Sequence, residues 1–197
     1  MASIFIFLMT VTVHEYCHGK VAEQLGDSTA RLSGRLSMNP LKHIDPLWTV
    51  LFPLILYVST GGRFVIGMAK PVPVNFMNLR NPKRDMIWVA LAGPLANFTL
   101  AALLAFFLRF YPAVFVLYAV YFNIGLGVFN LVPVPPLDGS RILTGLLPMK
   151  LAIPYLRLEK FGVPLVLALY FTGILPRLIF PVFNFVCRLV GVPPLGD

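Results

Sequence analysis

Long, largely apolar stretches alternate along this chain with shorter segments that carry most of its charged residues. Five such stretches stand out, and they cover residues 1–25, 46–62, 86–108, 110–137 and 161–190. A helix needs about 20 apolar residues to cross the hydrocarbon core of a bilayer, so residues 86–108 and 110–137 are long enough to span it. The pattern is therefore typical of helices that cross a membrane.

Prolines predict where these helices end or break. Pro133, Pro135 and Pro136 remove backbone donors, so a helix within residues 110–137 must end near Val132. For the same reason, residues 161–190 are predicted to be broken by prolines, which lie at positions 176 and 181.

The stretch between Pro46 and Gly61 offers only about 14 residues, which is the length of a buried or re-entrant helix rather than a span. The loops on both sides of it are rich in Lys and Arg, as is the loop before residue 161, whereas the loop after residue 108 holds only Arg109. Lys and Arg favour the cytoplasmic side, so the three basic loops share that side only if residues 46–60 dip in and return. We therefore expect four spans with the N-terminus outside.

The fold expected from this pattern is an all-α membrane protein. It is a polytopic helical bundle with about four spans, one re-entrant segment and a short β-like cytoplasmic loop. In that loop, residues 63–68 read as a short strand and residues 71–74 as extended chain. The chain has 197 residues, so residues 1–197 are expected to form a single integral-membrane domain.

Composition supports a membrane protein and narrows its partners. Hydrophobic residues make up 58% and charged residues 12% of the chain, against roughly 45–50% and 25% in soluble domains. The mean hydropathy of +0.82 also excludes a disordered chain. The net charge of +8 is explained by basic loops that flank membrane-spanning helices. We therefore expect a lipid bilayer, and no nucleic acid, as a partner. The N-terminus lacks a basic region and a cleavage site, so no removable signal peptide is expected.

A cluster of ionisable side chains interrupts the first apolar stretch. His14, Glu15 and His18 form an H-E-x-x-H motif. At about 100° per residue, the two histidines of a helix lie about 40° apart on one face, one turn from each other. Two imidazoles so placed can bind zinc, while the glutamate takes a proton from water. The alternative is a polar patch at a helix end, but ionisable groups within a membrane usually mark a functional site.

A catalytic zinc ion needs a third protein ligand. Asp138 directly follows a proline-rich segment, where irregular backbone at membrane depth must lie against protein or a watery cavity. On the expected topology Asp138 shares the cytoplasmic half of the membrane with His14 and His18, so it is well placed as a ligand. The remaining carboxylates lie in loops, at helix ends or at the terminus: Glu23, Asp27, Asp45, Asp85, Glu159 and Asp197.

Taken together, these motifs resemble the site-2 proteases, which are intramembrane zinc metalloproteases. The resemblance covers nearly the whole chain and rests on residues 93–97 and 130–139 besides the H-E-x-x-H motif, while residues 34–46 and 69–75 are similar to the signature of one subgroup. It is strongest to the small prokaryotic subgroup without extra soluble domains.

The resemblance implies one Zn²⁺ per chain, held by His14, His18 and Asp138, with Glu15 as general base. It also implies that Asn130 stabilises the oxyanion, although a capping or helix–helix hydrogen bond is the alternative for this amide. The implied activity is hydrolysis of peptide bonds in or near transmembrane segments of substrate proteins, that is, regulated intramembrane proteolysis. The implied location is the cell membrane, multi-pass, with an active site open to the cytoplasmic side.

Other readings stay open at this point. A metal carrier or an inactive scaffold of the same family would also hold a metal, although an intact Glu15 speaks for an enzyme. The loop over residues 63–76 is expected either to clamp an unwound substrate by backbone pairing or simply to lie at the membrane interface. The motif at residues 93–97 has a packing explanation. His43 is expected to stabilise a turn, and the two cysteines are expected to be buried thiols.

Overall fold

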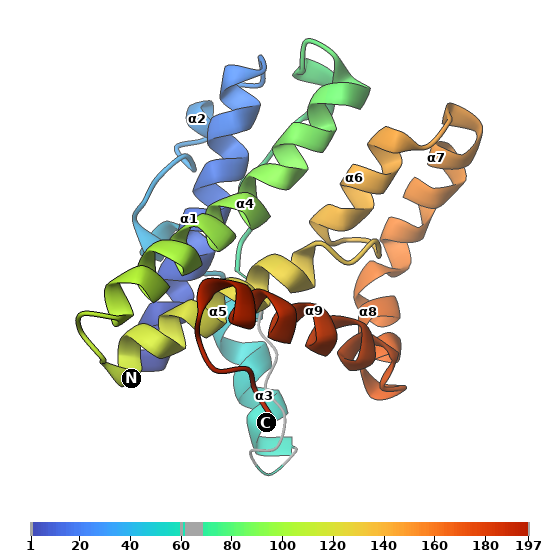
Figure 1. The fold of residues 1–197 in the computed structure, drawn as a ribbon. Helices are drawn as coiled ribbons and strands as arrows, with labels where there is room; N and C mark the ends of the chain where they lie inside the picture. Colours follow the sequence, from blue (N-terminus) through green and yellow to red (C-terminus); the bar gives the residue numbers. More distant parts are fainter. Residues whose placement is uncertain (1, 60, 62–68, 197) are drawn as a thin grey trace.

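The computed structural model describes residues 2–59, 61 and 69–196, and every regular element within them is a helix (Figure 1). The α-helices are α1 (Ala2–Gln24), α2 (Thr29–Leu32), α3 (Phe52–Ser59), α4 (Pro82–Leu108), α5 (Val114–Asn130), α6 (Asp138–Leu146), α7 (Met149–Leu156), α8 (Gly162–Phe171) and α9 (Ile174–Val190). Short 3-10 helices cover Pro40–His43, Phe76–Asn78 and Arg157–Phe161, and a π-helical turn covers Pro46–Leu51. The predicted all-helical character is confirmed for the described part of the chain.

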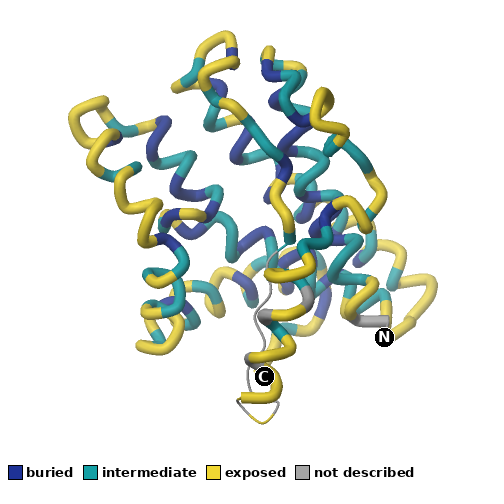
Figure 2. The backbone as a smooth tube through the Cα atoms, turned by 180° about the vertical axis from the view of Figure 1, so that it is seen from behind, coloured by how far each residue is buried: buried dark blue, intermediate teal, exposed yellow. Residues whose placement is uncertain are grey.

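The core of the molecule is formed by α1, α4 and α5, with α6 packed against α4 (Figure 1). Small side chains make this packing close. Ala101 and Ala105 of α4 are buried against Val120 and Ile124 of α5, and α9 adds Phe183 to the same cluster. Small residues let helix backbones approach in a membrane, where van der Waals contact drives association. By contrast, nearly all residues of α7 and α8 are exposed or half-buried (Figure 2).

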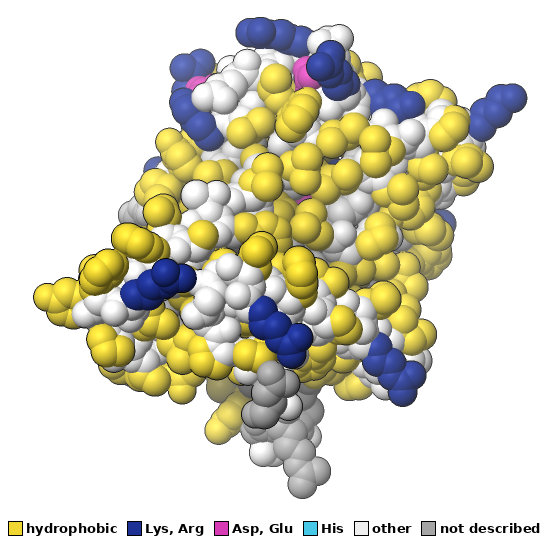
Figure 3. Space-filling model, viewed as in Figure 1, with side chains coloured by type: hydrophobic (Ala, Val, Ile, Leu, Met, Phe, Trp, Pro, Cys, Tyr) yellow, Lys and Arg dark blue, Asp and Glu magenta, His cyan; other side chains and the backbone are white. Residues whose placement is uncertain are grey.

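Only α4 is, by itself, long and apolar enough among the described helices to cross a membrane. A second candidate is the pair Met149–Phe171 and Ile174–Val190, which is bent by 78°. Figure 3 shows hydrophobic side chains over the middle of one face and many Lys and Arg side chains at its upper end. These features fit a helical membrane protein, whereas the number of spans and the re-entrant segment stay predictions.

The break in the last apolar stretch lies elsewhere than predicted. It falls at Gly173, whose φ of 74° leaves the helical region, and α9 then runs through both prolines. Pro176 is the third residue of α9, where a backbone N–H has no partner inside the helix, so it does not prevent the helix from starting. The expectation of a break at Pro176 and Pro181 was therefore wrong.

Two other regions also refine the expectation. The segment between residues 138 and 160, expected as a loop, contains α6 and α7. In the expected β-like loop, residues 69–75 have no regular structure, and residues 63–68 lie outside the described residues. Residues 69–75 are nevertheless held firmly. Arg35 donates from Nη2 to the carbonyl oxygens of Lys70 (2.8 Å) and Pro71 (3.3 Å), and the N–H of Lys70 donates to the carbonyl of His43 (2.9 Å).

The end of the same loop is tied to α1 through one buried carboxylate. Asp27, which is fully buried, accepts hydrogen bonds from the N–H and hydroxyl of Thr29, from the amide of Asn78 (3.0 Å) and from the N–H of Asn75 (2.7 Å). Burial raises the pKa of the Asp27 carboxyl, but these hydrogen bonds outweigh it and hold the pKa below its ordinary value.

Replacing Asp27 with Asn should therefore destabilise the protein. Because the pKa is lower in the folded state, the stabilisation is complete above the unfolded-state pKa of about 3.9 and is lost as the pH falls through the folded-state value. At pH 7 we expect Asp27→Asn to cost about 1–3 kcal/mol and to lower the thermal midpoint in detergent by roughly 2–10 °C. Near pH 3 the difference between the variant and the wild type should shrink. A midpoint difference that did not change with pH would contradict this role.

Candidate metal centre

Three side chains from two distant parts of the chain converge on one point. His14 and His18 lie one turn apart on α1 and are 4% and 7% exposed. Their Nε2 atoms are 3.0 Å apart, and they lie 3.1 and 3.2 Å from Oδ2 of Asp138. Within the described residues, this is the one group of His, Cys, Asp or Glu side chains that could hold a metal ion.

The proline-rich turn after α5 brings Asp138 to the histidines. The helix α5 ends at Asn130, and Asp138 is the first residue of α6. The next residue, Gly139, permits the close approach, because a Cβ there would lie 2.5 Å from the carbonyl oxygen of Val132. Only glycine lets α6 begin so close to the turn, so the turn and Gly139 together fix where the carboxylate stands.

One face of α4 supports both imidazoles. The Nδ1 of His14 lies 2.6 Å from Oδ1 of Asn97, and the Nδ1 of His18 lies 2.7 Å from the carbonyl oxygen of Val89. Both partners are acceptors, so each imidazole carries its proton on Nδ1 and turns the lone pair of Nε2 toward Asp138. His14 contacts Asn97, whereas His18, which follows it on α1, contacts Val89, which precedes Asn97 on α4. The two helices therefore run antiparallel.

Between these two partners, Gly93 leaves room for a metal ion. A Cβ on Gly93 would lie 2.7 Å from Nε2 of His14 and closer still to Nε2 of His18. A side chain at this position would therefore press against both imidazoles, beside the nitrogens that would hold the ion. Moreover, ligand atoms at about 2.0–2.1 Å from a tetrahedral zinc ion are about 3.3 Å apart, close to the 3.0–3.2 Å observed. The donor set and the space both fit zinc.

The proposed general base is held beside this group. Glu15 follows His14 on α1, and its Oε2 accepts a hydrogen bond of 2.7 Å from the backbone N–H of Val72. The loop over residues 69–75 therefore contacts the H-E-x-x-H motif directly. The sequence indicated an extended loop here but not its contact with Glu15.

Three other predicted residues have structural contacts. Asn130 donates from Nδ2 to the carbonyl of Leu126 (3.0 Å) within α5, which uses one of its two amide protons, so its catalytic role stays a prediction. Buried His43 lies with Nε2 2.9 Å from the carbonyl of Ser37, in agreement with the expected turn role. Sequence reasoning assigned Asn97 to packing and missed its contact with His14. The four-residue spacing of Gly93 and Asn97, matching that of the histidines, was the available signal.

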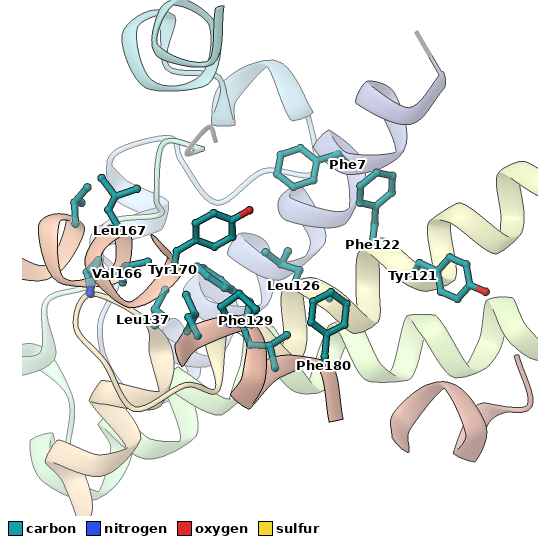
Figure 4. A pocket seen from close by; sticks show the side chains of 16 residues that line it. Phe7, Tyr121, Phe122, Leu126, Phe129, Leu137, Val166, Leu167, Tyr170 and Phe180 are labelled. Carbon is teal, nitrogen blue, oxygen red and sulfur yellow. The ribbon is translucent and has the colours of Figure 1, made fainter. Parts of the chain in front are cut away.

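The structure also contains an apolar cavity of about 510 Å³ (Figure 4). It lies between α5, α8 and α9, and Phe7 of α1 reaches it from the other side. Its lining residues are all aromatic, aliphatic or glycine, and they include Leu137, the neighbour of Asp138 in sequence. The lining of the cavity therefore extends to the residue that precedes Asp138 in the chain.

Comparison with known proteins places these observations in a family. The model of peptidase family M50 matches residues 2–114 and 112–173. The Bacillus subtilis protein YwhC is 32% identical over 92% of this chain and 85% of its own length, and Rip2 of Mycolicibacterium smegmatis is 30% identical over 94% and 73%. MJ0392 of Methanocaldococcus jannaschii is 29% identical over 58% of this chain and 39% of its own length. Each of these relatives is named as a zinc metalloprotease.

No solved structure matches the chain significantly. The family match covers most of the chain, so the resemblance to site-2 proteases is confirmed, and with it the zinc cofactor and the enzyme class. This chain belongs to peptidase family M50, the site-2 protease family of zinc metalloproteases.

Proposed function

We propose that this protein is an intramembrane protease that hydrolyses peptide bonds in or near transmembrane segments of substrate proteins, in regulated intramembrane proteolysis. The observation that carries the proposal is the convergence of His14, His18 and Asp138 beside Glu15, on helices with largely apolar surroundings. In this proposal His14, His18 and Asp138 hold one zinc ion.

The residues of the site divide the chemistry among them. Zinc, when bound, polarises a carbonyl and lowers the pKa of water to about 7. The Glu15 carboxylate takes the proton of the attacking water and passes it to the amine that leaves when the C–N bond breaks. Val72 holds that carboxylate in place through its N–H. Asn130 stabilises the negative charge that develops on the carbonyl oxygen, with the amide proton that Leu126 does not use.

The proposed location is the cell membrane, multi-pass, with the site open to the cytoplasm. The antiparallel contact between α1 and α4 supports the expected topology. If both helices cross the membrane and run in opposite directions, residues 46–60 between them cannot cross it as well. The basic loops on both sides of that segment then share one face, which the Lys and Arg preference assigns to the cytoplasm.

The proposed substrate is a membrane protein with an apolar segment that unwinds at the site. The cavity beside Leu137 supports this, because its lining offers apolar surface up to the residue before Asp138. The hydrogen bond from Val72 brings the loop over residues 69–75 to Glu15, which supports a contribution of this loop to substrate binding. The strand proposed over residues 63–68 lies outside the described residues.

Zinc content tests the metal site on which the function depends. We expect about one zinc ion per chain in the detergent-purified wild type, and clearly less in His14→Ala and Asp138→Ala, because a structure with two of three protein ligands binds zinc weakly. The measurement is elemental analysis of the monodisperse fraction. His43→Ala is a matched control, since this buried histidine lies outside the metal group, and it should keep its zinc.

Each outcome of this experiment has a distinct meaning. A wild type without zinc, purified without chelators, would contradict the metal centre altogether. Zinc lost in His14→Ala but retained in Asp138→Ala would leave the H-E-x-x-H motif standing and remove Asp138 as the third ligand. Loss in both variants and retention in the control would tie α1 and α6 into one site.

A further inference from the structure

A chain of buried amides crosses the centre of the bundle and ends on a metal-facing histidine. Asn97 of α4 is fully buried, Asn123 of α5 is 1% exposed and Thr10 of α1 is 2% exposed. A polar group buried without a hydrogen bond costs several kcal/mol, and water cannot compensate for it in the hydrocarbon region. The side chains of Thr10, Asn97 and Asn123 therefore need hydrogen-bond partners, and they bond with one another.

The hydrogen bonds of this chain have a fixed direction. Asn123 donates from Nδ2 to the carbonyl of Ala119 (2.8 Å) and to Oγ1 of Thr10 (3.1 Å). Asn97 donates from Nδ2 to Oδ1 of Asn123 (2.9 Å), and also lies 3.5 Å from the carbonyl of Thr10. Its own Oδ1 lies 2.6 Å from Nδ1 of His14.

The backbone carbonyl of Ala119 sets this direction, because a carbonyl oxygen can only accept. The amide nitrogen of Asn123 must face it, which leaves the Asn123 oxygen toward Asn97. Asn97 must then turn its nitrogen to Asn123 and its oxygen to His14. An oxygen in that place requires a proton on Nδ1 of His14, so the lone pair is on Nε2, the nitrogen that faces Asp138.

We propose that Asn97 and Asn123 are positioning residues, which set the tautomer and the ring orientation of His14. They link Nδ1 of His14 to the carbonyl of Ala119 through hydrogen bonds of fixed direction. This inference rests on the proposed metal site. His18 needs no such chain, since the backbone carbonyl of Val89 holds it directly. The two histidines of one motif are thus held differently at Nδ1, by a side chain in His14 and by the backbone in His18.

The test compares zinc affinities, measured by chelator competition on monodisperse protein in detergent. Asn97→Leu keeps the branching of the side chain but removes the acceptor, and it should weaken zinc binding about 10–100-fold. Asn97→Asp should bind zinc more tightly than Asn97→Leu, because a protonated carboxyl group can donate its hydroxyl to Oδ1 of Asn123 and present its carbonyl oxygen to His14. Asn123→Leu should weaken zinc binding less than Asn97→Leu.

A second readout separates positioning from simple loss of stability. With Co²⁺ alone as probe, Asn97→Leu should change the ligand-field absorption, whereas Asn97→Asp should leave it close to that of the wild type. Asn184→Ala is the control, since Asn184 bonds only with Leu195 in the described structure, far along the chain from the site. It should change neither the affinity nor the spectrum.

The outcomes distinguish this inference from the proposed function. Wild-type protein that binds no zinc would overturn the metal site itself. One zinc bound with equal affinity in wild type, Asn97→Leu and Asn123→Leu would overturn the positioning role and leave the metal site intact. Equal weakening in Asn97→Leu and Asn97→Asp would also overturn it, because only a packing role treats the two alike. If Asn97→Leu does not give monodisperse protein, Asn123→Leu, which touches no metal-facing atom, decides the question.

Discussion

Glu15→Gln is expected to lower the rate of peptide cleavage by at least about 100-fold while the zinc content stays at its wild-type value. The amide of glutamine has nearly the shape of the carboxylate, and its oxygen can still accept the hydrogen bond from Val72. It cannot accept a proton from water at neutral pH. The variant thus removes the base and keeps both the metal ligands and the contact with the loop.

The measurement is cleavage of a transmembrane substrate reconstituted with the protein, followed beside elemental analysis of the same preparation. Glu23→Gln is the matched control on the same helix, because Glu23 pairs with Lys20 and Arg31 and has no contact with the metal group. It should cleave at the wild-type rate. Unchanged cleavage in Glu15→Gln would mean that another group acts as base, and loss of zinc would mean that Glu15 is a ligand.

The pairing of His14 with His18 could be predicted from sequence because it depends on helix periodicity alone. The convergence of Asp138 on them needed a further step, the distribution of basic loops, which placed the ends of α1 and α5 on one side. The structure places Oδ2 of Asp138 3.1 and 3.2 Å from the Nε2 atoms of the two histidines, whereas the membrane side on which these helix ends lie stays a prediction. The prolines after α5 likewise predicted the end of the helix, because a missing N–H acts locally.

Contacts between helices could not be predicted in the same way. Asn97 reaches His14 only because α1 and α4 pack against each other in antiparallel directions, with these two residues at the same level of the helix pair. The hydrogen bond of Val72 to Glu15 depends on a loop that Asp27 and Arg35 hold from two sides. Neither of these two contacts is marked by a local sequence pattern, apart from the four-residue spacing of Gly93 and Asn97.

Short helices escaped prediction for a different reason. The helices α6 and α7 have nine and eight residues, and charged residues such as Arg141 and Lys150 lie in them, so no long apolar run marks them. The break at Gly173 was missed because two nearby prolines gave a stronger signal. A single glycine with positive φ can change the direction of a chain. The amino-acid composition does not show which of the glycines adopts that conformation.

Gly93→Ala is expected to remove the metal with a single methyl group. A Cβ at this position would lie 2.6 Å from Cε1 and 2.7 Å from Nε2 of His14, and closer still to His18, where carbon and nitrogen atoms in contact need more than 3 Å. Neither imidazole can move away freely, because Asn97 and Val89 hold them from the other ring nitrogen. We expect the zinc content to fall from about one ion per chain to near zero, and cleavage to fall to background.

The matched control is Gly125→Ala, which adds the same methyl to a helical glycine of α5. There the nearest atom would be a ring carbon of Phe183 at 3.7 Å, an ordinary contact, so zinc should be retained. Thermal midpoints of the two apo proteins separate the mechanisms. If Gly93→Ala lost zinc only because the bundle had come apart, its midpoint would drop far below that of Gly125→Ala. A folded Gly93→Ala protein with full zinc would show instead that α4 can shift by about an ångström, and that the glycine serves packing alone.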